Sequence, residues 1–373
     1  MKICHLTSVH SQNDTRIFIK ECQSLFESGF EVHFVVPGAQ TSIVEGVQIH
    51  GIVKDKGNRL KRMTRTVDRV FKKGLEIEAD VYHFHDPELI PIGLKLKKLG
   101  KVVIYDVHED VPRQILTKKW LPKNTHSLVS KLVEMYENYA AKKMDFIIAA
   151  TPFIRDRFLE LGCNSLDINN YPLLEELKVE NVLWDEKENA ICYMGGIAFI
   201  RGIREMVEAV SMTKETTLLL GGKFVMLSER DIVTNLEGWK QVEELGFLNR
   251  KQVKETFSKS KAGLVTLYPT INYMDALPVK MFEYMAAGIP VVASNFPLWK
   301  EIIEKSKSGL CVDPLNPKEI AKAINWVMEN PLQAEQMGRN GREAVEKEFN
   351  WETESKKLIS VYKSLMKKQE EIL

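Results

Sequence analysis

Two acidic residues and a proline stand close together in the second half of the chain. Asp275 and Glu283 are eight residues apart, and Pro278 lies between them. Proline favours the start of a helix, because the amide hydrogens of the first turn have no partner within the helix. These free amides carry partial positive charge and favour a phosphate group. The segment therefore predicts an anion site flanked by two carboxylates, which suits a diphosphate with hydroxyl groups on both sides, as in a nucleotide sugar.

A glycine turn earlier in the same half is followed by an arginine, Arg201. Gly195 and Gly196 follow a strand pattern and precede a helix pattern. Glycines let backbone amides approach a ligand closely, and Arg201 adds a permanent, fork-shaped cation suited to a diphosphate. A tight strand-to-helix turn with a solvated arginine explains the same residues equally well. Lys280 and Arg16 are candidates for a second cation.

The segment from Leu277 to Ser294 resembles the paired-acid signature, E-x7-E, of the family 4 retaining glycosyltransferases with the GT-B fold. The resemblance covers nearly the whole chain. It implies that Glu283 binds the ribose of a nucleoside diphosphate sugar and that Asp275 contacts hydroxyls of the transferred sugar. The family usually has Glu at the first position, so Asp275 is one methylene shorter than expected.

The resemblance also extends to the glycine turn. The family usually has a basic residue where this chain has Gly196, and a lysine where it has Arg201. The expected donor-binding residues are Gly195, Gly196, Arg201, Asp275, Leu277, Pro278, Val279, Lys280 and Glu283.

Polar residues also end two predicted strands in the first half, at residues 83–88 and 105–110. Strand alternation places His83 and His85 on one face, and Asp86 is expected to cap the helix that follows. A His-x-His pair beside acids also occurs in metal-dependent hydrolases, but these take further ligands from a barrel of eight equal units, and this chain has a two-half pattern. The sequence also has no Asp-x-Asp pair, typical of metal-using glycosyltransferases. We therefore expect no metal and no cofactor.

Both strand ends resemble those of the sugar-transferring family. The resemblance implies that His108 lies against the donor sugar, where it would bond a hydroxyl or stabilise charge as the glycosidic bond breaks. Arg16, His85 and Asp86 are expected on the acceptor side, and Arg16 would meet an anionic acceptor or the diphosphate. A histidine after a strand is often structural, and Arg16 equally fits an exposed position in the first turn of a helix capped by Asp14.

Apolar runs alternate with helix-period segments along the chain, which is the pattern of parallel sheets covered by helices. Strands are expected at residues 2–6, 31–36, 81–84, 102–105, 146–149, 166–168, 190–194, 217–220, 261–265, 289–292 and 310–312. Helices are expected in the first half at residues 15–28, 87–99, 127–143 and 152–161. The predicted fold class is α/β, with two Rossmann-like doubly wound domains facing a cleft.

A polar stretch near Asp185 suggests the domain boundary. We expect an acceptor-side domain at residues 1–184 and a donor-binding domain at residues 185–350. The resemblance implies that the last helix, residues 351–373, packs back on the first domain.

Composition limits the function classes. The chain has 373 residues and a net charge of +1, so bulk charge predicts no nucleic-acid partner. Its five cysteines are scattered without a C-x-x-C pair, which is typical of reduced thiols in a cytoplasmic protein. No apolar run has the length of a membrane span, and no signal-peptide pattern is present, so we expect a cytoplasmic protein.

Residues 54–73 are strongly basic, with nine Lys or Arg against two Asp. Apolar residues fall among them at helical spacing: Leu60, Met63, Val67, Val70 and Phe71. This pattern is typical of a helix on an anionic membrane, or beside a lipid diphosphate, and equally of a helix packed on the sheet. Residues 118–123 add a tryptophan in a basic loop, which favours peripheral contact with a membrane surface.

These observations predict a metal-independent glycosyltransferase of the hexosyltransferase type. It would move a sugar from a nucleoside diphosphate sugar to a glycan acceptor, expected to be lipid-linked, in cell-surface polysaccharide synthesis. His108, Asp275 and Arg201 are the expected catalytic residues. Two alternatives are a nucleotide-sugar 2-epimerase, which would change the sugar without an acceptor, and a non-catalytic subunit that binds nucleotide sugars.

Overall fold

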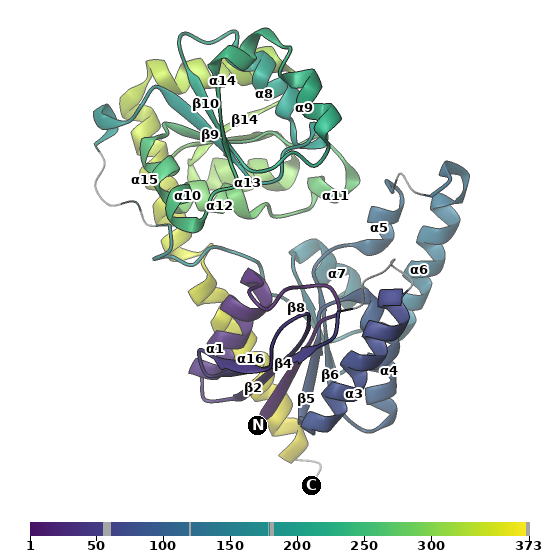
Figure 1. Ribbon diagram of the computed structural model, residues 1–373. Helices are drawn as coiled ribbons and strands as arrows, with labels where there is room; N and C mark the ends of the chain where they lie inside the picture. Colours follow the sequence, from purple (N-terminus) through teal and green to yellow (C-terminus); the bar gives the residue numbers. More distant parts are fainter. Residues whose placement is uncertain (55–60, 119–120, 178, 180–182, 371–373) are drawn as a thin grey trace. The chain divides into compact units, whose positions relative to one another are not determined.

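The computed structural model describes residues 1–373 except 55–60, 119–120, 178, 180–182 and 371–373. The chain divides into two compact units, one of residues 1–170 and 354–373, the other of residues 171–353. Each unit contains a largely parallel sheet with helices on both faces (Figure 1). The prediction of an α/β fold with two Rossmann-like domains is confirmed.

The first unit contains an eight-stranded sheet in the order β3-β4-β2-β1-β5-β6-β7-β8. Its strands are β1 (Lys2–Leu6), β2 (Glu31–Pro37), β3 (Ser42–Val44), β4 (Val47–Ile52), β5 (Val81–Phe84), β6 (Val102–Val107), β7 (Phe146–Ala149) and β8 (Ser165–Asp167). The antiparallel β3–β4 hairpin was not predicted. Its two-residue turn, Glu45 and Gly46, has positive φ at both positions, as a type I′ turn requires.

Helices of the first unit cover the predicted positions. They are η1 (Thr15–Cys22), α1 (Gln23–Glu27), η2 (Arg62–Thr66), α3 (Val67–Ile77), η3 (Pro87–Leu89), α4 (Ile90–Lys98), α5 (Val111–Ile115), η4 (Lys123–Thr125), α6 (His126–Ala141), α7 (Pro152–Glu160) and α16 (Trp351–Glu370). The helix expected at residues 15–28 is present as η1 and α1, but η1 is π-helical. Asp14 caps it as predicted, with its carboxylate accepting from the amides of Arg16 and Ile17.

The second unit has a six-stranded sheet in the order β11-β10-β9-β12-β13-β14. Its strands are β9 (Ala190–Met194), β10 (Thr217–Gly221), β11 (Val242–Gly246), β12 (Ala262–Val265), β13 (Val291–Ser294) and β14 (Gly309–Val312). Strand β11 was not predicted, because this edge strand exposes Glu243 and Glu244 and lacks an apolar pattern. The strand expected at residues 289–292 begins later, since the amide of Ile289 still bonds the carbonyl of Tyr284 at the helix end.

Both faces of the second sheet are covered. Along β9, Cys192 and Met194 lie in one apolar core, whereas Ile191 and Tyr193 lie in another. The helices of this unit are η5 (Trp184–Glu186), η6 (Phe199–Arg201), α8 (Ile203–Val210), α9 (Leu227–Val233), η7 (Glu237–Gln241), α10 (Arg250–Lys259), α11 (Ile271–Met274), α12 (Val279–Ala286), α13 (Pro297–Ser306), α14 (Pro317–Glu329) and α15 (Pro331–Lys347).

The division between units falls at residues 170/171, before the expected boundary at 184/185. The ring of Tyr171 packs 4.7 Å from that of Phe282, and Leu177 and Trp184 are buried in the cores of the second unit. The polar residues near Asp185 therefore lie in η5 and in the segment before β9, and they do not mark a change of core.

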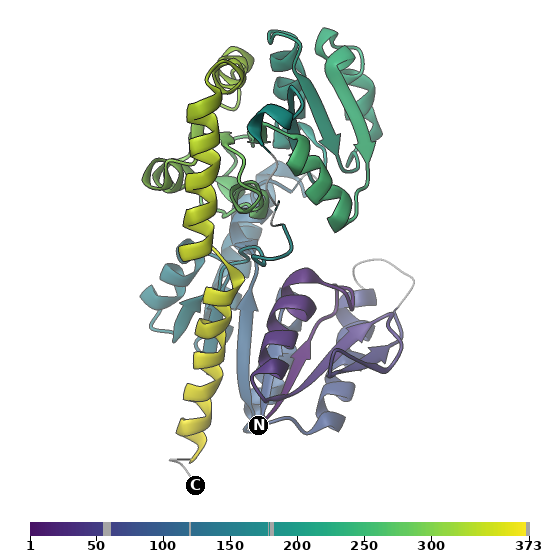
Figure 2. The same ribbon diagram turned by 90° about the vertical axis from the view of Figure 1, so that its left-hand side faces the viewer.

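Helix α16 belongs mostly to the first unit, as the resemblance implied. Figure 2 shows it as a long helix beside the sheet of that unit. Leu358, Val361 and Tyr362 are buried, and the Tyr362 hydroxyl lies 2.7 Å from Nδ1 of His83. Among the described helices, none combines the length and apolar composition needed to cross a bilayer.

Candidate functional site

Helix α12 begins where the sequence predicted. Pro278 precedes its first residue with extended backbone angles, and no side chain caps this end. Trp299 anchors the preceding loop, because its Nε1 donates to the carbonyl of Ala276 at 2.6 Å. Asp275 lies on this loop, directly after α11. The start of α12 thus presents uncapped amides, which suit an anion.

Glu283, within α12, is held by a cation that sequence analysis missed. Its Oε1 lies 2.8 Å from Nη1 of Arg250, which also pairs with Glu176 at 2.6 and 2.9 Å. Burial lowers the pKa of Arg250, but the two carboxylates outweigh burial and raise it overall. Glu283 is only 9% exposed. The guanidinium fixes one carboxylate oxygen, and the capping box of Asn249 and Gln252 at the start of α10 positions Arg250.

The glycine turn after β9 brings Arg201 inward. Nη1 of Arg201 donates to the carbonyl of Gly196 at 3.1 Å. A Cβ at position 196 would lie 2.6 Å from this same Nη1, so a larger residue would displace the guanidinium. Gly202 has φ +81°, and a Cβ there would lie 2.0 Å from the carbonyl oxygen of Thr266. The glycine that departs from the family pattern therefore makes room for Arg201.

Lys280 supplies the second cation of this turn. Its ammonium is buried, has no hydrogen-bond partner among the described residues, and lies 3.8 Å from the ring centroid of Tyr193. A Cβ at Gly195 would lie 3.2 Å from this nitrogen. Burial, together with the charge of Arg201, lowers the pKa of Lys280 to about 7. The structure thus brings Arg201, Lys280 and the two glycines together at the start of α12.

In the first unit, Asp106 connects three of the predicted residues. This fully buried carboxylate accepts from Nε and Nη2 of Arg16 at 3.2 and 2.9 Å, and from Nε2 of His108 at 2.9 Å. Nδ1 of His85 lies 3.1 Å away. Burial raises the pKa of Asp106, but Arg16 and His108 outweigh burial and hold it well below its usual range. Sequence analysis missed Asp106, although strand alternation places it on the same face as His108.

The bond to Asp106 also orients His108. Because a carboxylate only accepts, Nε2 of His108 carries the proton, and Nδ1 remains for a ligand. The side chain is 18% exposed, so that ligand can come from outside the core.

Two sequence interpretations in this unit are wrong. The guanidinium of Arg16 is buried, and it also bonds the carbonyl of Ile168 at 2.8 Å, so it is not an exposed residue on a capped helix. Asp86 does not cap η3 with its side chain. Its carboxylate instead accepts from the Thr7 hydroxyl and the Ser8 amide at 2.7 and 2.6 Å, which ties the first loop to β5. Contact of these residues with an acceptor stays a prediction.

Comparison with known proteins places the chain in a family. A family model for "Glycosyltransferase Family 4" matches residues 16–168, and one for "Glycosyl transferases group 1" matches residues 175–344. The chain belongs to family 4 of the glycosyltransferases. The resemblance of the acidic segment is thereby confirmed, and the protein is a transferase enzyme, which supports neither the epimerase nor the non-catalytic subunit.

Curated relatives of this glycosyltransferase are distant in sequence. D-rhamnosyltransferase WbpZ of Pseudomonas aeruginosa is 24% identical over 288 residues, covering 73% of this chain and 70% of the relative. An MMP alpha-(1->4)-mannosyltransferase of Mycolicibacterium hassiacum is 21% identical over 301 residues, covering 74% and 69%.

Solved structures share the fold along nearly the whole chain. Sucrose-phosphate synthase of Thermosynechococcus elongatus has a TM-score of 0.79 at 17% identity, covering 98% of this chain and 99% of that structure. HepE of Anabaena, in complex with UDP, has a TM-score of 0.73 at 15% identity, covering 98% and 100%. These likenesses confirm the GT-B fold.

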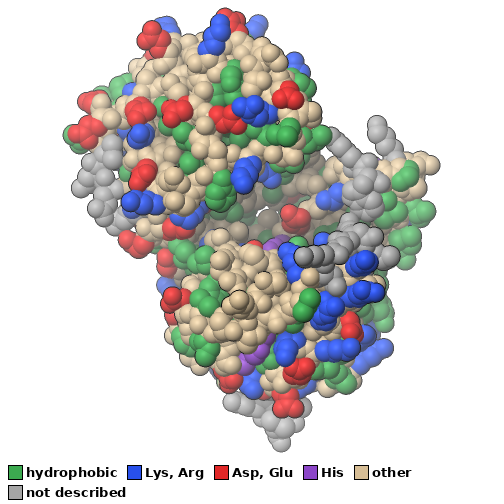
Figure 3. Space-filling model, viewed as in Figure 1, with side chains coloured by type: hydrophobic (Ala, Val, Ile, Leu, Met, Phe, Trp, Pro, Cys, Tyr) green, Lys and Arg blue, Asp and Glu red, His purple; other side chains and the backbone are tan. Residues whose placement is uncertain are grey.

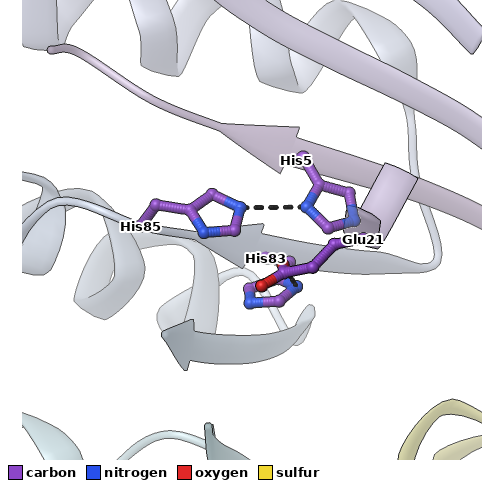
Figure 4. Close-up of side chains that lie close together, drawn as sticks. All are labelled: His5, Glu21, His83 and His85. Carbon is purple, nitrogen blue, oxygen red and sulfur yellow. Dashed lines mark hydrogen bonds and ion pairs between the residues drawn. The ribbon is translucent and has the colours of Figure 1, made fainter. Parts of the chain in front are cut away.

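The glycosyltransferase also contains a buried group that the sequence revealed only in part. His83 and His85 were identified, but His5 and Glu21 join them: one potential ligand atom from each of the four lies within 4.8 Å of the others (Figure 4). His85, Asp106 and His108 form a second such group. The register pairing of His5 with His83 across β1 and β5 is the signal that would have revealed the first.

Proposed function

We propose that this glycosyltransferase binds a nucleoside diphosphate sugar in its second unit and transfers the sugar to a glycan. The observation that carries the proposal is the Lys280 ammonium, buried without a hydrogen-bond partner among the described residues. A buried cation without an anion is costly, and a diphosphate would remove that cost. Arg201 and the amides of α12 add further positive charge beside it.

Glu283 and Asp275 would then bind the two ends of the donor. Arg250 holds one oxygen of Glu283, so the other is available for ribose hydroxyls. Asp275, on the loop before α12, would contact hydroxyls of the transferred sugar. Two relatives are named as sugar transferases, and HepE is described in complexes with UDP and with UDP-glucose, which supports a nucleotide-sugar donor.

We propose retention of configuration and transfer without a metal at the diphosphate. The acceptor oxygen forms the new bond to the anomeric carbon as the bond to the diphosphate breaks, and the acceptor proton passes to the leaving diphosphate. Arg201 and Lys280 neutralise the charge that develops there, which is the task that a metal would otherwise perform. His108, oriented by Asp106, would contact the sugar through Nδ1.

A thermal-shift screen of nucleoside diphosphates and their sugars tests the donor site. One of them should raise the melting temperature of the wild type, because a ligand that binds only the folded state stabilises it. Lys280→Met, Arg201→Ala and Glu283→Gln should each lose most of that shift. Arg204→Ala is the matched control, because Arg204 is exposed on α8 and forms an ion pair with Glu208. A full shift in Lys280→Met would refute the proposal.

We also propose that the first unit contacts an anionic membrane, where a lipid-linked acceptor for cell-surface polysaccharide would lie. In the predicted basic helix, Val67 and Val70 are buried in the core and Met63 is exposed, while Leu60 and Trp120 lie outside the described residues. Helix α6 offers a larger apolar contact. Its exposed apolar residues are Leu128, Leu132, Met135, Tyr136 and Tyr139.

Charge around α6 favours the same partner. Lys131, Lys142 and Lys143 are exposed on or directly after this helix. Figure 3 shows hydrophobic side chains over α6 and a group of Lys and Arg side chains over the neighbouring part of the same unit. An exposed apolar helix face flanked by lysines is typical of a helix that lies on an anionic lipid surface.

A further inference from the structure

We propose that the first unit holds a structural transition-metal ion of the zinc class, bound by His5, His83, His85 and Glu21. This ion would be separate from the donor site and would take no part in sugar transfer. The four side chains are fully or almost fully buried, at 0 to 2% exposure, so the site is closed to solvent. Imidazole nitrogens and carboxylate oxygens are both usual zinc ligands, and a closed site with four protein ligands is typical of structural zinc, whereas catalytic zinc keeps an open position.

The backbone brings the three imidazoles together. His5 in β1 and His83 in β5 are register partners on adjacent parallel strands, and His85 follows two residues later on the same face. The ring centroids are 4.6 Å apart for His5 and His83, 4.5 Å for His83 and His85, and 5.2 Å for His5 and His85. Glu21 comes from the π-helical segment η1, a form of helix that is frequent at functional sites.

Hydrogen bonds select one nitrogen of each ring for a ligand. Nδ1 of His85 is held by Asp106 at 3.1 Å, so Nε2, which shares a 2.9 Å hydrogen bond with Nδ1 of His5, is the nitrogen that a metal would bind. Nδ1 of His83 is held by the Tyr362 hydroxyl at 2.7 Å, and its Nε2 is buried without a hydrogen-bond partner in the described chain. Metal-bound histidines typically have their second nitrogen held in this way by a carboxylate or another polar group.

His5 completes the set of rings. Its Nε2 lies 3.5 Å from the same Tyr362 hydroxyl, and its Nδ1 lies 2.9 Å from Nε2 of His85. This separation is close to that of two neighbouring nitrogen ligands, each about 2 Å from one ion. The dashed line in Figure 4 joins these two nitrogens, with His83 and Glu21 beside them.

Glu21 provides the acidic ligand. Both of its carboxylate oxygens are buried without a hydrogen-bond partner among the described residues. Oε1 forms an ion pair with Arg16 at 3.1 Å, whereas Oε2 lies 4.0 Å from Nδ1 of His83, the nitrogen that the Tyr362 hydroxyl holds. Arg16 is thus a competing cation that orients one oxygen and leaves Oε2 for the metal. Arg16 is itself neutralised by Asp106, which reduces its repulsion of an ion.

Metal analysis of the untagged full-length protein tests this inference. After dialysis against a chelator and reloading with Zn²⁺, we expect about one bound ion per chain and a higher melting temperature, because binding to the folded state stabilises it. Glu21→Gln and His83→Gln should lose the bound ion. His50→Gln is the matched control and should keep it, since His50 pairs with His33 outside this cluster.

Three outcomes would overturn the proposal. The first is an apo protein that takes up no Zn²⁺ or Co²⁺. The second is equal metal content in Glu21→Gln, His83→Gln and His50→Gln. If the variants fail to fold, X-ray absorption of the zinc-loaded wild type decides, and fewer than two histidine ligands would refute the site. Nucleotide binding by the second unit is measured separately, so either proposal can fail alone.

Discussion

Lys280 shows at the scale of one residue how the fold changes chemistry. Its neighbours Tyr193 and Gly195 give the ammonium no acceptor, and burial lowers its pKa to about 7. A lysine whose pKa lies near 7 can take up a proton when an anion binds beside it. Sequence spacing indicated the position of this residue, but only the packing around it revealed its altered protonation.

The shifted pKa of Lys280 predicts a pH dependence of stability. Its unfolded value is 10.5, so between about pH 7 and 10.5 the unfolded chain binds the additional proton, and the stability of the fold rises with pH. Relative to Lys280→Met, which cannot titrate, the free energy of unfolding of the wild type should rise through this window, by on the order of 1 kcal/mol per pH unit. Urea denaturation between pH 7 and 9.5 measures this difference.

A difference between wild type and Lys280→Met that is constant with pH would contradict the lowered pKa. Lys251→Met is a suitable control for the replacement of a lysine by methionine, because the Lys251 side chain is 85% exposed.

Arg250 and Asp106 show what residue-level patterns miss. Both contact predicted site residues, Glu283 and His108. Asp106 is only two positions from its partner on one strand face, so alternation could have revealed it. Arg250 lies on another helix, α10, and no local pattern connects it to α12.

At the scale of elements, helix α6 has an exposed apolar face where a helix of this class usually has a polar one. We expect Leu132→Gln with Met135→Gln to reduce sedimentation with anionic vesicles at low salt at least several-fold, because the apolar contact is lost. Stability should change by no more than about 0.5 kcal/mol, since both side chains are largely exposed.

Leu227→Gln provides the control for this double variant. Leu227 is 74% exposed but belongs to the second unit, so vesicle binding should be unchanged. Equal binding of the wild type to neutral and anionic vesicles would contradict membrane contact by charge.

At the scale of the whole molecule, α16 completes the first unit from the far end of the chain. Tyr362→Phe removes the hydroxyl beside His83 and should lower the free energy of unfolding by about 1 kcal/mol, since a buried ring nitrogen loses its partner. Equilibrium urea denaturation measures the loss. Tyr136→Phe, at an exposed position on α6, should leave stability unchanged, and an equal effect of both variants would contradict a structural role for the Tyr362 hydroxyl.

Local patterns were sufficient for much of the architecture. Apolar runs and Pro278 predicted the buried strands and the start of α12, because propensity and periodicity act over a few neighbouring residues. The acidic pair and the glycine turn identified the family through the same short segments. The sequence pattern did not reveal strand β11, because this edge strand buries too few side chains to need an alternating apolar pattern.

Tertiary packing decided what local patterns leave open. The pairing of Glu283 with Arg250, the burial of Arg16 and the gathering of His5, Glu21, His83 and His85 all join segments far apart in the chain. The burial and charge of a side chain depend on these distant neighbours, so its pKa and partners follow from the folded contacts. For that reason residue types and spacing indicate which chemistry is possible, and the packed structure determines which groups are free to perform it.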